Sequence, residues 1–300
     1  MKNFQGKVAV ITGGAGGFGR EFAIVGARLG MKLVLADVEQ GALDQTAGEL
    51  RSAGAQVLAV KTDVSEAAAV DALAKATVEE FGVPSLVFNN AGVGHGGLIW
   101  EHDLSDWEWL LGVNLWGVVH GLRAFTPMML DAAKKDPAYE GHMVNTASMA
   151  GLLTAPNMGI YNVSKHAVVA LTETLYQDLR LVTDQVSCSV LCPYFVPTGI
   201  HRSGRNRPSE LAQESKPTAS QMIAQAMSDK AVTSGKVTAA QVAEAVFGAI
   251  AADRFYIFSH PHALGNVTSR MQAIVDQKNP PDPFAARPEV GEKLRGQLRS

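Results

Sequence analysis

Three side chains in the middle of the chain have types and spacing that suit proton transfer. Tyr161 and Lys165 lie four residues apart, and Ser148 precedes Tyr161 by thirteen residues. Residues four apart on a helix share one face. A free tyrosine has a pKa of about 10, and a neighbouring ammonium favours the phenolate and lowers that pKa. The pattern suggests Tyr161 as a general acid/base, Lys165 as the residue that tunes it and Ser148 as a hydrogen-bond partner of the substrate oxygen.

A glycine-rich segment near the start of the chain suits dinucleotide binding. The sequence TGGAGGFG follows an apolar run and precedes a helical pattern. Glycines there let backbone N–H groups approach a phosphate, and the helix adds its N-terminal dipole. Two registers fit: Gly14, Gly16 and Gly19 match G-x-G-x-x-G, whereas Gly13, Gly17 and Gly19 match T-G-x-x-x-G-x-G. The glycines alone do not choose between them.

Acidic residues follow the next two expected strands. Asp37 is placed to accept hydrogen bonds from the ribose hydroxyls of an adenosine and to repel a 2′-phosphate. Val38 follows it, so no arginine reverses the charge at that position, and NAD is favoured over NADP. Asp63 and Val64 are placed to meet the adenine. An ordinary helix N-cap at Asp63 or Ser65 is the competing interpretation.

Alternating β-rich and helical runs predict the scaffold that positions these residues. We expect strands at 7–12, 32–36, 56–61, 85–88, 142–146, 186–191 and 255–258. We expect helices at 18–29, 41–53, 66–81 and 267–277. Continuously apolar strands alternating with helices indicate an α/β fold, a Rossmann-type doubly wound parallel sheet of about seven strands with helices on both faces. Ligands of such sheets bind at the carboxyl ends of the strands.

The run Asn89-Asn90-Ala91-Gly92 and the later Asn114 complete a set of ordered motifs. Small residues at the end of the fourth strand permit close approach to a cofactor. With these motifs the chain resembles the short-chain dehydrogenase/reductase family, in its NAD-preferring single-domain form. The resemblance runs from about residue 7 to residue 198. The matching residues are Gly13, Gly17, Gly19, Asp37, Asp63, the Asn-Asn-Ala-Gly run, Asn114, Ser148, Tyr161 and Lys165.

The resemblance implies hydride transfer between a nicotinamide cofactor and an alcohol or ketone. It selects the register of Gly13, Gly17 and Gly19. The implied catalytic residues are Ser148, Tyr161, Lys165 and Asn114, with Asn114 holding a water that links the lysine to solvent. The implied cofactor contacts are Gly13, Gly17, Phe18, Gly19, Asp37, Asp63, Val64, Asn90, Ala91, Gly92, Tyr161, Lys165, Pro193 and Thr198.

One position departs from the family pattern. The family usually has a glycine after the proline that matches Pro193, and this chain has Tyr194. The family pattern therefore does not define the backbone conformation of this loop in this chain. Tyr194 is expected either at the substrate pocket or packed under a lid.

Apolar residues near the expected reaction centre favour a hydrophobic or aromatic secondary alcohol or ketone as substrate. They are Val93, Met149, Leu152, Leu153, Met158, Tyr194, Phe195 and Ile200, with Met222 and Met227 as lid candidates. Three arginines, Arg202, Arg205 and Arg207, leave an acidic substrate possible. Two alternatives stay open: a dehydratase or epimerase on the same scaffold, and a non-catalytic dinucleotide-binding protein.

Length and pattern predict one principal domain. We expect a single dinucleotide-binding and catalytic domain over residues 1–265, with a substrate lid over about 199–235. Residues 266–300 form a C-terminal extension, where Pro280, Pro281 and Pro283 end a helix and favour an extended path. The family resemblance implies a homodimer or homotetramer formed through the helices that follow the fourth and fifth strands.

Composition excludes several other classes of protein. The 300 residues carry a formal net charge of −3, which gives no basic field for nucleic acid. The short apolar run near the start predicts neither a signal peptide nor a membrane span, so we expect a cytoplasmic protein without a membrane partner.

Neither the cysteines nor the histidines predict a special site. Cys188 and Cys192, four apart on one expected strand, share a face but lie too far apart for a disulfide, and buried thiols are expected. The eight histidines show no dense ligand cluster, so no metal is expected. His260 and His262 form an isolated pair, and His166 is expected to point away from the reaction centre.

Overall fold

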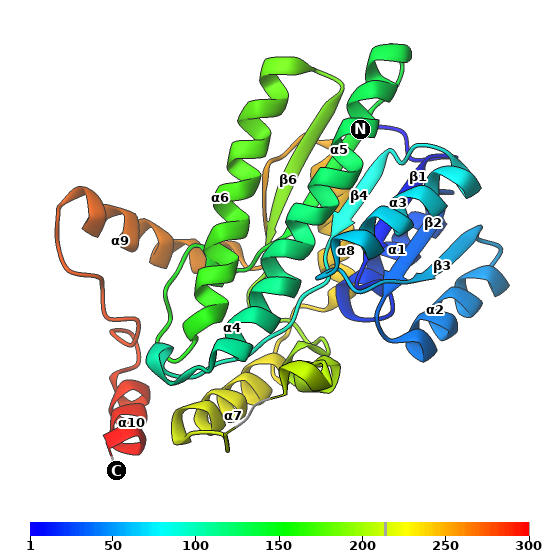
Figure 1. The fold of residues 1–300 in the computed structure, drawn as a ribbon. Coiled ribbons are helices and arrows are strands. Elements are labelled where there is room, and N and C mark those ends of the chain that lie inside the picture. Colours follow the sequence, from blue (N-terminus) through cyan, green and yellow to red (C-terminus); the bar gives the residue numbers. More distant parts are fainter. Residues whose placement is uncertain (213–214, 300) are drawn as a thin grey trace.

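Seven parallel strands form one sheet. The computed structural model describes residues 1–212 and 215–299 (Figure 1). The strands are β1 (Val8–Thr12), β2 (Lys32–Asp37), β3 (Val57–Lys61), β4 (Leu86–Asn89), β5 (Gly141–Thr146), β6 (Val186–Cys192) and β7 (Tyr256–Phe258). Their order is β3-β2-β1-β4-β5-β6-β7, and each neighbouring pair is parallel. The predicted Rossmann-type fold is confirmed.

Helices cover both faces of this sheet. One face packs against α1 (Gly17–Arg28), α2 (Gln40–Ser52) and α8 (Ala239–Ala251). The other packs against α3 (Ala67–Phe81), α5 (Gly117–Lys135) and α6 (Gly159–Val182). Successive strand residues point to opposite faces, so Ile11 belongs to the first layer and Val10 to the second. Strands buried on both faces are mostly apolar, and the buried polar side chains of β5 and β6, such as His142, Asn145 and Ser189, are hydrogen-bonded inside the protein.

Aromatic rings fill the first layer. Phe88 of β4 stacks on Phe22 of α1, with ring centroids 4.5 Å apart, and lies 5.7 Å from Phe247 of α8. These contacts fix α1 against the sheet. The glycine-rich turn that precedes α1 is therefore held close to the end of β4.

A π-helical segment, Gly112–Trp116, joins α4 (Leu104–Leu111) to α5. Such segments are rare and occur often at functional sites, because the widened turn redirects a side chain. Here the segment points Asn114 inward, and Asn114 is fully buried.

The expected lid contains two short 3₁₀ turns, Ile200–Asn206 and Ser209–Leu211, and the helix α7 (Ala219–Thr233). A capping box between Thr218 and Gln221 begins α7. Ser220 accepts a hydrogen bond from the Leu98 backbone N–H and donates one to Glu101. These bonds attach α7 to the loop that follows β4, next to α4 in Figure 1.

The C-terminal extension contains two helices, α9 (Leu264–Val275) and α10 (Pro288–Arg299). The first begins three residues before its expected start at 267. The second was not expected, and it packs through the buried Leu294 and through Gly291, which lies against the Phe284 ring. The three prolines lie in the non-helical stretch between the helices, as expected. In the described part of the chain no helix has the length and apolar character needed to cross a membrane.

Candidate active site

A large cavity opens at the carboxyl ends of the central strands. Its volume is about 2210 Å³. The catalytic residues expected from the sequence that line it are Ser148, Tyr161 and Lys165. The expected cofactor residues that line it are Gly13, Gly17, Phe18, Asp37, Asp63, Val64, Asn90, Ala91, Gly92, Pro193 and Thr198. The fold thus brings together residues from distant parts of the sequence.

The glycine turn has the geometry of the register Gly13, Gly17 and Gly19. Gly13 and Gly17 have φ angles of 66° and 51°, a region that favours glycine. A Cβ at Gly19 would overlap the Gly13 carbonyl oxygen, so any other residue there would push the turn apart. Gly16 has open space around it. The turn therefore requires glycine at these three positions and not at Gly16.

Asp37 ends β2 beside this turn. Its carboxylate accepts hydrogen bonds from the backbone N–H groups of Ala15 and Glu39, both at 3.0 Å. Burial raises the pKa of Asp37, and these two hydrogen bonds oppose that rise. The carboxylate thus fixes the glycine turn and faces the cavity.

The Asn-Asn-Ala-Gly run pins β4 to its neighbours. The Asn90 side chain donates to the Thr12 carbonyl at 2.9 Å, and the Thr12 hydroxyl accepts from the backbone of Asn90 and Ala91. Asn89 donates to Asn145 of β5 at 2.8 Å. These bonds set the distance between the glycine turn and β5, the strand that leads to Ser148.

Tyr161 and Lys165 lie on the first turns of α6. Lys165 Nζ lies 5.7 Å from the Tyr161 ring centroid and donates to the Thr146 carbonyl at 2.9 Å. Burial raises the pKa of Tyr161 to about 12, against the opposing effect of Ser148. Burial also lowers the pKa of Lys165 to about 8. Burial therefore determines the pKa of the phenol in the protein without cofactor, and the predicted lowering stays a prediction for the protein with its cofactor bound.

Ser148 follows β5 and caps a short 3₁₀ turn, Met149–Gly151. Its hydroxyl accepts from the Ala150 N–H at 3.1 Å and donates to the Pro193 carbonyl at 3.3 Å. The interaction of Ser148 with Tyr161 places both hydroxyl groups in the same part of the cavity. One oxygen of a small ligand can therefore meet both groups.

Asn114 does not present a free side chain. Its amide accepts from the Val93 N–H at 2.8 Å and donates to the Val93 carbonyl and to Ser164. Gly92 separates it from Lys165: a Cβ on Gly92 would lie 3.4 Å from Asn114 Oδ1 and 3.6 Å from Lys165 Nζ. The side chain therefore holds the strand end in place and leaves a narrow space beside the lysine ammonium.

The loop after β6 brings the last predicted residues to the cavity. Thr198 packs near Gly17, since a Cβ on Gly17 would lie 3.4 Å from the threonine Cβ. Tyr194 is 41% exposed, lines the cavity and packs against Phe195 and His260. Of the two places expected for Tyr194, its side chain occupies the one at the cavity wall.

Asp63 forms a local turn before α3. Its carboxylate accepts from the backbone and hydroxyl of Ser65, while the N-cap of α3 is Glu66. The competing interpretation of an N-cap at Asp63 or Ser65 is wrong by one to three residues. Val64 is buried and Asp63 remains at the cavity wall.

Most residues expected near the substrate line the cavity. They are Val93, Met149, Leu153, Met158, Tyr194, Phe195, Ile200 and Met227. Leu152 and Met222 do not: Leu152 packs into the core and Met222 is exposed. Sequence reasoning missed Trp107, Trp109 and Leu211, which also line the wall. Apolar periodicity in α4 is a signal for burial, and it does not reveal which buried side chains meet a cavity.

Sequence reasoning also missed how the lid is anchored. Arg207 donates to the buried Asp106 at 2.5 Å and to Ser105 at 2.9 Å, and its guanidinium lies over the Trp109 ring. Arg205 pairs with Glu39, two residues after Asp37. Two of the three lid arginines, Arg205 and Arg207, are thus paired with protein carboxylates.

The chain is similar to known dehydrogenases over most of its length. A family model described as short chain dehydrogenase matches residues 7–209. A short-chain dehydrogenase/reductase from Burkholderia phymatum, solved in complex with NAD, is 56% identical with a TM-score of 0.92, over 95% of this chain and 100% of that chain.

Two curated relatives extend this similarity. The CLA biosynthesis dehydrogenase/reductase of Lactiplantibacillus plantarum is 34% identical over 93% of this chain and 97% of its own length. The 1-deoxy-11-beta-hydroxypentalenate dehydrogenase of Streptomyces exfoliatus is 34% identical over 87% of this chain and 86% of its own.

Proposed function

The chain belongs to the short-chain dehydrogenase/reductase family, and on this premise we propose that it is an NAD-dependent oxidoreductase that interconverts a secondary alcohol and a ketone. The observation that carries the proposal is the convergence of Tyr161, Lys165 and Ser148 with the glycine turn in one cavity. Such a site holds a dinucleotide and moves a proton at the same place.

The cavity fits NAD at its nucleotide end. The turn at Gly13, Gly17 and Gly19 leaves room for a pyrophosphate and excludes larger residues. Asp37 offers a carboxylate to the ribose hydroxyls and would repel the 2′-phosphate of NADP. The Burkholderia relative was solved with NAD, which agrees with this choice. We assign Pro193 and Thr198 to the nicotinamide end.

When bound, the nicotinamide supplies the hydride chemistry. Tyr161 accepts the hydroxyl proton of the alcohol, or donates a proton to the ketone oxygen in the reverse direction. Ser148 donates a hydrogen bond to the same oxygen and holds it beside the phenol. Lys165 supplies positive charge that favours the phenolate. Asn114 fixes the wall beside the lysine, where a water linked to solvent completes the relay.

The substrate we propose is hydrophobic or aromatic. The cavity wall near Tyr161 is largely apolar, and its aromatic members include Trp107, Trp109 and Phe195. The lid arginines Arg205 and Arg207 are engaged with Glu39 and Asp106. Because these two guanidinium groups are already paired, we do not expect a substrate carboxylate to bind to them.

We propose a single catalytic domain over residues 1–265, covered by the lid at 199–235 and followed by the extension at 266–300. A homodimer or homotetramer in the cytoplasm is the expected form. Exposed apolar side chains support an assembly through this pair of helices: Val163, Leu181 and Val182 lie on α6, and Trp116 ends the π-helical segment directly before α5.

A substrate panel tests the proposal. Aliphatic, aromatic, steroid and sugar alcohols are each supplied with NAD, and the NADH absorbance is followed. We expect turnover with apolar secondary alcohols and little with sugars. Conversion of substrate without net change in NADH would favour a dehydratase or epimerase, and NAD binding without any conversion would favour a non-catalytic protein.

A further inference from the structure

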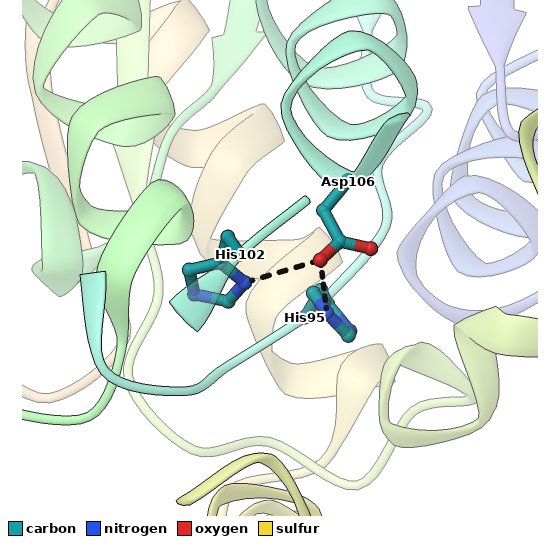
Figure 2. Close-up of side chains that lie close together, drawn as sticks. All are labelled: His95, His102 and Asp106. Carbon is teal, nitrogen blue, oxygen red and sulfur yellow. Dashed lines mark ion pairs between the residues drawn. The ribbon is translucent and has the colours of Figure 1, made fainter. Parts of the chain in front are cut away.

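Two histidines and one aspartate converge beside the catalytic cavity (Figure 2). His95 comes from the loop after β4, His102 from the segment before α4, and Asp106 from the first turn of α4. His95 Nε2 and His102 Nδ1 lie 3.4 Å and 3.5 Å from the same carboxylate oxygen, Asp106 Oδ2. The side chains of His102 and Asp106 are completely buried.

The two imidazoles are not held by ordinary hydrogen bonds. His95 Nε2 and both ring nitrogens of His102 are buried and have no hydrogen-bond partner among the residues that the structure describes. N–H···O bonds are usually about 2.7–3.2 Å long, and buried polar nitrogens are nearly always paired. Beyond the two long contacts with Asp106, these three ring nitrogens have no hydrogen bond, which leaves them available to another partner.

The spacing of the three donor atoms suits a metal ion. In a tetrahedral zinc site with bonds of about 2.0–2.1 Å, neighbouring ligand atoms lie about 3.3 Å apart. The two histidine–aspartate distances, 3.4 Å and 3.5 Å, are close to that value. One donor atom from each residue lies within 4.8 Å of the others, so a modest rotation of the rings completes the geometry.

A second layer of bonds already orients the carboxylate. Arg207 Nη1 donates to Asp106 Oδ1, the oxygen that faces away from the histidines. The Asp103 backbone N–H donates to Asp106 Oδ2 at 3.1 Å. Metal-binding carboxylates and histidines are typically held by such outer partners. These two bonds hold the carboxylate in a fixed orientation toward the two imidazoles.

We propose that His95, His102 and Asp106 bind a zinc ion beside the substrate cavity. Two imidazoles and one carboxylate are ligands that zinc accepts, and three protein ligands leave one coordination position for water or a substrate oxygen. His95 also lines the catalytic cavity. The positive charge of Arg207 opposes the ion, so we expect weaker binding than at a closed four-ligand site.

The site would lie between α6 and the lid. His102 packs against Gly159, the first residue of α6, two positions before Tyr161. Arg207, on the opposite side of Asp106, belongs to the lid. A bound ion would therefore fasten the β4 loop to α4 between these two parts, with no change in the hydride chemistry.

Zinc titration tests the proposal without any need for enzyme activity. The full-length protein, stripped with a chelator, is titrated with Zn²⁺ in a calorimeter, and we expect one equivalent to bind. His95→Gln and His102→Gln should each weaken binding more than about tenfold, because even the loss of an outer partner of a metal ligand costs about 10–100-fold. His260→Gln is the matched control, because His260 and His262 are the other close histidine pair, with rings 5.5 Å apart. It should leave zinc affinity unchanged.

Anomalous scattering at the zinc edge locates the ion in crystals of the wild-type protein soaked with Zn²⁺. A peak about 2.0–2.2 Å from His95 Nε2, His102 Nδ1 and Asp106 Oδ2 supports the proposal. The proposal is overturned if the wild type binds no zinc. Binding that survives in His102→Gln but is lost in His260→Gln overturns it as well. Because neither readout uses NAD or substrate, the result is independent of the proposed oxidoreductase activity.

Discussion

Lys165 holds its ammonium 5.7 Å from the centroid of the Tyr161 ring and 2.9 Å from the carbonyl oxygen of Thr146. Both titratable groups share one buried pocket. Burial moves the pKa of the phenol to about 12 and that of the ammonium to about 8. Each shift favours the uncharged form, so we expect the positive ring of a bound cofactor to add to the charge of the lysine and make the phenolate accessible.

Lys165→Met should stabilise the cofactor-free protein at pH 7. The native state holds a buried ammonium whose pKa falls from 10.5 to about 8, so the charged form is disfavoured there. One pKa unit corresponds to about 1.4 kcal/mol, and the gain in unfolding free energy is expected to be about 1–3 kcal/mol. Urea denaturation of both proteins measures it.

The pH dependence of that gain identifies its cause. Below pH 8 the lysine is protonated in the native and unfolded states, and its burial cost is fully present. Between pH 8 and 10.5 the native state loses its proton first, so the stability of the wild type rises relative to the variant. The gain should be nearly absent above that range. A gain that stays constant from pH 7 to pH 10.5 would show that packing, and not charge burial, is responsible.

Gly19→Ala should destabilise the protein far more than Gly16→Ala. A Cβ at Gly19 would overlap the Gly13 carbonyl oxygen, whereas a Cβ at Gly16 meets no atom within 4 Å. Overpacking typically costs about 1–3 kcal/mol, and we expect at least about 2 kcal/mol at Gly19 against about 0.5 kcal/mol or less at Gly16. Equal losses of unfolding free energy would mean that the turn is not built on the register of Gly13, Gly17 and Gly19.

Asp37→Asn should reduce the preference for NAD over NADP. The substitution removes the negative charge that would repel a 2′-phosphate and keeps one oxygen for the Ala15 or Glu39 N–H. The ratio of kcat/KM values for the two cofactors should fall at least about tenfold, or ~1.4 kcal/mol. An unchanged ratio, with an unfolding free energy close to that of the wild type, would count against the assignment of Asp37 to the ribose.

The sequence predicted the scaffold well because the fold repeats one local pattern. Most residues of each strand are apolar, and helical patterns or turns separate the strands, so all seven strands were predicted to within one residue of their ends. The glycine register could be chosen through the family resemblance, and the positive φ angles of Gly13 and Gly17 agree with it. Helix α10 was missed because the prolines before it favour extended chain and its own residues are mostly polar.

The parts that could not be predicted depend on tertiary contacts. The pKa of Tyr161 is set by burial, which a four-residue spacing does not reveal. The cluster of His95, His102 and Asp106 has separations of seven and four residues that match no common ligand motif, and it forms only when the β4 loop folds back onto α4. The pairing of Arg207 with Asp106 joins residues 101 positions apart.

The central claim is that Tyr161 transfers the proton in an NAD-linked redox reaction, and Tyr161→Phe tests it most directly. Tyr176→Phe, the same change further along α6, serves as the control. With a substrate found in the panel, Tyr161→Phe should lower kcat by about 10²–10⁴-fold, the usual contribution of a general acid/base, while the Kd for NAD stays within about threefold. Tyr176→Phe should retain wild-type turnover. A Tyr161→Phe protein that binds NAD normally and keeps most of its kcat would contradict the account.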